Sequence, residues 1–149
     1  MPFRFTLKAV LRLRESFELR ERQRLQVITR EVVRARQQQE QAKLDRTNAA
    51  VQFQKKLHQG MNGAEMQFEL ACDRTRVRRI AAVAEKLGKL EELRRRQFEV
   101  FRKAQQQRKI MENLRDRQLA AYQLVQSRRE QQRMDDRFLI TLAARLSDS

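Results

Sequence analysis

The chain has 149 residues, of which 36% are charged, 40% hydrophobic and 6% aromatic, with three glycines, one proline and a net charge of +15. This composition excludes an ordinary compact globule, which needs more large apolar side chains, and is typical of long helices or a coiled coil. A lone cysteine excludes an internal disulfide, and with a single histidine it excludes the common zinc arrangements.

The first predicted helix covers about residues 7–58, because its apolar residues recur at spacings of three and four. Gln39 and Arg46 fall on this seam, and several of its residues are alanines, so its central part is expected to bury little area. The apolar seam residues are Leu7, Val10, Leu11, Phe17, Leu25, Ile28, Val32, Ala35, Ala42, Ala49, Phe53 and Leu57.

A turn is predicted at residues 59–63, which hold two of the three glycines and the turn dipeptide Asn62-Gly63. Two glycines this close together favour a reversal of the chain over a kink in one continuous helix.

The second predicted helix covers about residues 64–138, and the tail 139–149 is expected either to fray or to offer a binding surface. Arg94, Arg108 and Arg115 interrupt its apolar seam. The predicted seam residues are Val77, Ile80, Ala84, Leu87, Leu90, Phe98, Phe101, Ala104, Met111, Leu114, Leu119, Tyr122 and Val125.

These elements predict an all-α fold with one domain over residues 1–149, an antiparallel coiled-coil hairpin of two long helices. Residues whose numbers add up to about 122 should lie opposite each other. The second helix is the longer one, so its end should overhang the first and leave apolar residues exposed between Tyr122 and Ala144.

The positive charge is spread along the chain, since residues 1–58 carry 14 basic and 6 acidic side chains and residues 64–138 carry 19 and 12. A spread basic excess indicates acidic partners, which are protein surfaces, nucleic acid or anionic lipid. The sequence has no Gly-rich phosphate loop and no pair of carboxylates placed for catalysis, so we expect no enzyme activity, no cofactor and no metal site.

Apolar runs are too short to span a membrane, and the N-terminal residues lack the uninterrupted apolar stretch of a signal peptide. We therefore expect a cytoplasmic protein without direct membrane insertion, which reaches the inner face of the cell membrane only through partners.

Both ends of the chain carry a recognisable pattern. Residues 3–15 combine Phe3-x-Phe5-x-Leu7, a Val-Leu pair and an Arg-Glu step, and residues 129–136 read Arg-Glu-Gln-Gln-Arg-Met-Asp-Asp. These ends resemble the FliJ family of flagellar export proteins. The resemblance implies a soluble stalk of the flagellar type III export apparatus that binds the hexameric export ATPase and promotes its ring assembly and activity. It also implies contact with the cytoplasmic domain of the membrane export gate and with export chaperones.

The resemblance implies two sets of binding residues. Candidates for the ATPase ring are Phe3, Phe5, Leu11, Arg12, Arg14, Arg129, Gln132, Met134 and Asp135. Candidates for the export gate are Ala42, Arg46, Ala49, Phe53, Val77, Ile80 and Ala84. Packing within the hairpin is the alternative role for each seam position in these sets.

Three other functions are compatible with the sequence: a basic coiled coil that binds nucleic acid, a purely structural coiled coil, and the equivalent stalk of an injectisome. The uniform spread of charge and the few aromatic residues argue against a specific nucleic-acid partner.

Overall fold

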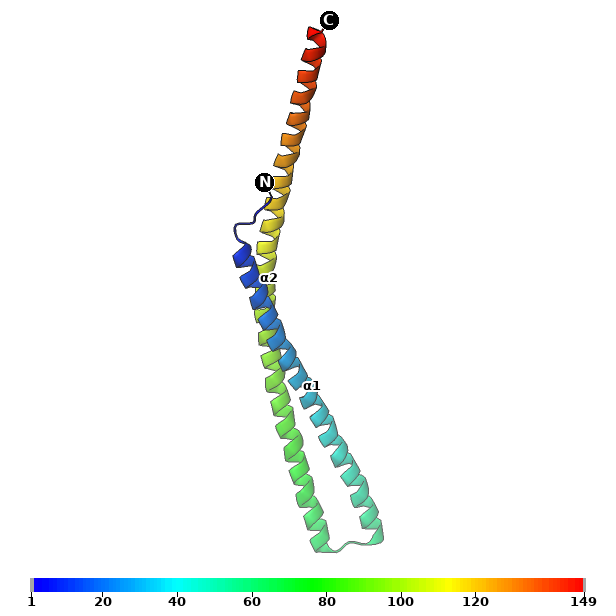
Figure 1. Ribbon diagram of the computed structural model, residues 1–149. Helices are drawn as coiled ribbons and strands as arrows, with labels where there is room; N and C mark the ends of the chain where they lie inside the picture. Colours follow the sequence, from blue (N-terminus) through cyan, green and yellow to red (C-terminus); the bar gives the residue numbers. More distant parts are fainter. Residues whose placement is uncertain (1, 149) are drawn as a thin grey trace. The chain divides into compact units, whose positions relative to one another are not determined.

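A computed structural model of the chain describes residues 2–148, which form two helices and no strand (Figure 1). Helix α1 covers Lys8–Gln59 and helix α2 covers Gly63–Ser147. The two helices pack against each other, so the predicted all-α helical hairpin is confirmed. Helix α2 continues to Ser147 instead of ending near Phe138, since residues 139–147 contain no glycine or proline that would stop it.

Three residues between the helices reverse the chain, within the predicted turn. Gly60 has φ +98°, a left-handed conformation that ends α1, and its N–H donates to the Leu57 carbonyl at 3.2 Å. Asn62 caps α2, because its Oδ1 accepts the Glu65 N–H at 2.8 Å while the Glu65 side chain lies 3.4 Å from the Asn62 amide.

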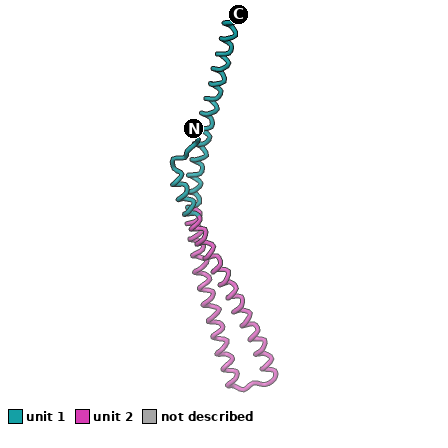
Figure 2. Tube along the Cα trace, viewed as in Figure 1, with its two compact units in different colours: residues 1–18, 104–149 teal, residues 19–103 magenta. Residues whose placement is uncertain are grey.

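The described residues divide into two compact units (Figure 2). Unit 1 contains residues 2–18 and 104–148, and unit 2 contains residues 19–103. In unit 1, Arg14 donates to Gln107 at 2.7 Å; in unit 2, Lys56 lies 3.3 Å from Glu69. Both pairs are close to the predicted antiparallel register.

The core of unit 2 is narrow and comes from α1. Val32 is fully buried, and Ala35 and Ala42 are almost fully buried. Among residues 63–147, α2 has no fully buried side chain, so its own seam is only half-buried. The alanines allow α2 to approach closely but remove little apolar area from water, as expected from the sequence.

The half-buried face of α2 differs in part from the predicted seam. Val77, Ala84, Phe98 and Val125 are exposed. The half-buried side of α2 follows a seven-residue repeat that faces α1 and, at its C-terminal end, the segment before α1. It includes positions 76, 80, 83, 87, 90, 94, 97 and 101 in unit 2, and 104, 108, 111, 115, 119 and 122 in unit 1. Apolar residues lie almost all around α2. The predicted seam and the neighbouring half-buried stripe are therefore similarly apolar, and the spacing of apolar residues does not indicate which of the two is buried.

Phe5 and Leu11 form the apolar core of unit 1. The ring of Phe3 lies 5.6 Å from the ring of Tyr122, measured between centroids, and attaches the segment that precedes α1 to α2.

Candidate partner-binding surfaces

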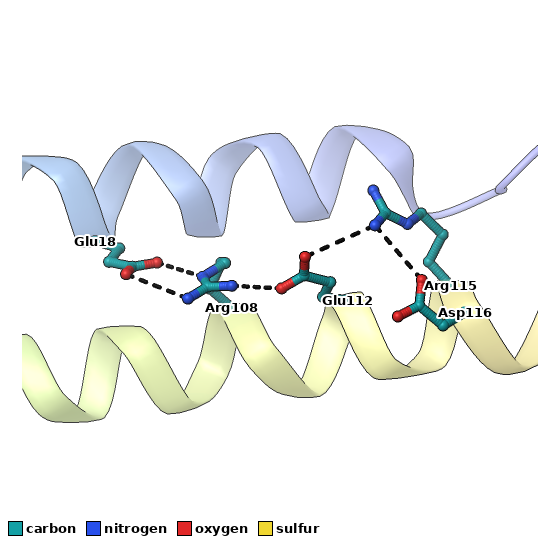
Figure 3. A network of polar contacts seen from close by, with 5 residues as sticks. All are labelled: Glu18, Arg108, Glu112, Arg115 and Asp116. Carbon is teal, nitrogen blue, oxygen red and sulfur yellow. Dashed lines mark hydrogen bonds and ion pairs between the residues drawn. The ribbon is translucent and has the colours of Figure 1, made fainter.

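A network of charged side chains links α1 and α2 inside unit 1 (Figure 3). Arg108 donates through Nε and Nη2 to the two carboxylate oxygens of Glu18, at 2.5 and 3.4 Å. Arg108 also pairs with Glu112, and Arg115 bridges Glu112 and Asp116 at 3.8 and 3.5 Å.

Glu18 is buried at 5% exposure, and its ion pair with Arg108 contributes to the compensation of its charge. The hydrogen bonds to Glu18 raise the pKa of Arg108, with Glu112 adding to the effect. Arg108 was expected only to interrupt the seam; instead it neutralises a buried carboxylate there and holds the two helices in register.

A second buried carboxylate lies in unit 2. Gln97 donates from Nε2 to Glu21 Oε2 at 2.6 Å and to the Glu21 carbonyl at 3.1 Å. The Gln97 hydrogen bond, followed by the charges of Arg24 and Arg20, lowers the pKa of Glu21 against the opposing effect of burial. Sequence reasoning missed both residues, since neither is apolar.

The proposed ring-binding residues near the N-terminus come together in unit 1. Phe3, Phe5, Leu11 and Arg12 line a groove of about 330 Å³, which Lys8, Glu15 and Arg115 complete. Phe5 and Leu11 are buried and support the groove, whereas Arg12 is exposed and available to a partner. Arg14 lies outside this groove and is half-buried against Gln107.

The remaining ring candidates lie on the exposed C-terminal part of α2 and do not line this groove. Helical spacing places Arg129, Gln132 and Asp135 next to one another along one side of α2, while Met134 faces away from that side. A partner that contacts all four must therefore surround the helix instead of binding one face.

Unit 2 carries a second groove between the helices, of about 420 Å³. Three gate candidates, Arg46, Ala49 and Phe53, line it. Arg46 makes a bidentate ion pair with Asp73 across the groove, at 3.0 and 3.3 Å, and its hydrogen bonds lower the pKa of Asp73. The other lining residues are Thr47, Ala50, Glu69, Leu70 and Arg76.

The other gate candidates are distributed differently. Ala42 is buried at 4% exposure, so it packs within unit 2 and is inaccessible to a partner unless the helices separate. Ile80 is half-buried on the seam, and Val77 and Ala84 are exposed beside it. Leu70, which lines the groove, was not among the residues predicted from the sequence. Its position next to the predicted seam could have indicated it.

No helix among residues 2–148 is long and apolar enough to cross a lipid bilayer.

These features define a class of protein, a basic helical hairpin with grooves between its helices and an exposed helical segment at the end of α2. A family model described as "Flagellar FliJ protein" matches residues 3–146. The chain therefore belongs to the FliJ family, as the patterns at its two ends predicted, and is a component of flagellar protein export. Searches of curated proteins and of solved structures gave no match.

Proposed function

We propose that this chain is the coiled-coil stalk of the flagellar export apparatus. In this role it binds the hexameric export ATPase, promotes ring assembly and hydrolysis, and connects the ring to the membrane export gate and to export chaperones. Membership of the FliJ family is the observation that carries the proposal.

The surface of unit 1 supports the assignment of ring binding to that unit. Every residue from 127 to 147 is exposed and helical, and this stretch includes Arg129, Arg133 and Arg137. These arginines recur at four-residue spacing and form a basic stripe, which can face acidic residues that line a ring opening. The groove with Phe3 and Arg12 adds a smaller apolar contact.

The groove of unit 2 supports the assignment of gate binding to that unit. Phe53 and Leu70 give it an apolar floor, and the Arg46–Asp73 pair supplies polar groups at its edge. Apolar grooves with a few fixed polar groups are typical binding sites for a protein segment. In this arrangement the protein is cytoplasmic and joins the inner face of the membrane through the gate.

The decisive experiment adds the purified chain to the purified export ATPase and measures ATP hydrolysis and hexamer formation. We expect both to rise with the concentration of the chain. No change in either quantity would contradict the stalk function.

Two controls separate the alternatives. Duplex DNA in place of the ATPase should bind weakly at physiological salt and without sequence preference, because only distributed charge attracts it. The ATPase of an injectisome should respond less than the flagellar ATPase.

A further inference from the structure

The C-terminal segment of α2, residues 127–147, presents an apolar stripe on an exposed helix. Met134, Phe138 and Leu142 follow one another at four-residue spacing and therefore share a face. Met134 and Phe138 are 69% and 67% exposed, and Leu142 is 42% exposed. Ile140 is also 69% exposed but lies on the opposite side of the helix.

The stripe contains a shallow groove of about 210 Å³, bounded by Arg137, Phe138, Thr141, Leu142 and Arg145. Four of these side chains, at positions 138, 141, 142 and 145, have the spacing of a hole that accepts one side chain from a facing helix in a coiled coil. A medium-sized, flexible apolar side chain such as methionine suits a hole of this kind.

We propose that the occupant is the same segment of a second copy of this chain, running antiparallel. Phe138 lies next to the midpoint of the segment, so a twofold axis beside it pairs the two exposed segments along their full length. Met134 of each copy then faces the hole between Phe138 and Arg145 of the other.

A repeated ion pair supports this pairing, and it outnumbers the one like-charge contact of the register, between Arg137 of the two copies beside the axis. In the same register Glu130 of one copy lies beside Arg145 of the other, and the twofold axis makes this pair twice. Unit 1 of the second copy does not obstruct the pairing. In this register the part of unit 1 in which α2 packs against α1 lies beyond the C-terminal end of the first copy's α2. The contact area is small, so the dimer is weak and depends on concentration.

This inference goes beyond the proposed function and limits it in one respect. Pairing covers Met134, one of the proposed ring contacts, so the dimer and the ring complex exclude each other at that residue. Self-association is measured without the ATPase, so its failure is distinguishable from failure of the stalk function.

Crosslinking tests the interface. In a Cys72→Ser background, Phe138→Cys should react with a short bismaleimide to give covalent dimers several-fold faster than Ile140→Cys, whose side chain is equally exposed but faces away. Equal rates would overturn the proposal. An equimolar mixture of Met134→Cys and Leu142→Cys chains should give mixed dimers, whereas a parallel pairing would give Met134→Cys dimers and overturn the antiparallel arrangement.

Sedimentation gives an independent measurement. The average mass of the wild-type chain and of Ile140→Glu should rise with concentration, and that of Phe138→Glu should stay at the monomer value. Circular dichroism should show equal helix content in all three, because both substituted residues are exposed. A wild-type mass that stays constant with concentration would overturn the proposal.

Discussion

At the scale of single residues, the buried ion pair of Glu18 with Arg108 joins α1 to α2 in unit 1. Removal of one partner from a buried ion pair leaves an uncompensated charge, whereas replacement of both partners by apolar residues is often neutral. A double-mutant cycle on Glu18 and Arg108 therefore measures how strongly the two side chains are coupled.

We expect Arg108→Met to lower the free energy of unfolding by about 2–3 kcal/mol, because the buried Glu18 loses its ion pair with Arg108. Adding Glu18→Leu to that variant should recover most of the loss. Thermal and urea unfolding followed by circular dichroism measure both effects. Arg95→Met, on the exposed face of α2, is the control and should change stability little. Additive losses in the double variant would contradict a coupled pair.

Glu21 predicts how stability depends on pH. Its folded-state pKa is lower than the ordinary glutamate pKa of 4.5, so the unfolded chain binds more protons in this range. The stabilisation is present above pH 4.5 and is lost as pH falls through the lower, folded-state pKa. Gln97→Leu removes the main cause of the lowered pKa, so this variant should lose less stability than the wild type between neutral and acidic pH. If the stability of the variant fell with pH as much as that of the wild type, Gln97 would not be the cause of the lowered pKa of Glu21.

At the scale of elements, the glycines of α2 and of the turn have opposite roles. Gly60 has a positive φ, which an alanine adopts only with strain, so Gly60→Ala should cost about 1 kcal/mol. Gly88 lies inside α2, and a Cβ there would meet nothing within 4 Å. Gly88→Ala should therefore raise stability by up to about 1 kcal/mol. Melting temperatures of the two variants should move in opposite directions, and a shared direction would argue against the cap at Gly60.

At the scale of the whole molecule, the two proposed binding functions belong to different units and should be separable by substitution. Arg129→Glu combined with Arg133→Glu should reduce stimulation of the export ATPase several-fold while leaving gate binding unchanged. Phe53→Ala combined with Leu70→Ala should reduce binding to the cytoplasmic domain of the gate while leaving ATPase stimulation unchanged. Hydrolysis assays and calorimetric titration measure the two functions, and loss of both in either variant would contradict the division.

The binding sites were predictable from the sequence only in part. The patterns at the two ends indicated the family and selected Phe3, Phe5, Leu11 and Arg12, which do meet in one groove. The resemblance also selected Ala42 as a gate contact, yet its position on the seam buries it inside unit 2. A residue on a seam is near the partner helix, and nearness alone does not tell whether an outside molecule can reach it.

The sequence by itself determined the two helices, the turn and the antiparallel pairing. Helix formation depends on local composition, and the near absence of glycine and proline outside residues 59–63 leaves one place for a reversal. Only the tertiary structure decided that Val83 and Gln97, and not Ala84 and Phe98, face α1, and that Glu18 and Glu21 are buried there. Which side of a helix is buried depends on the surface that packs against it, and that surface comes from residues far away in the chain.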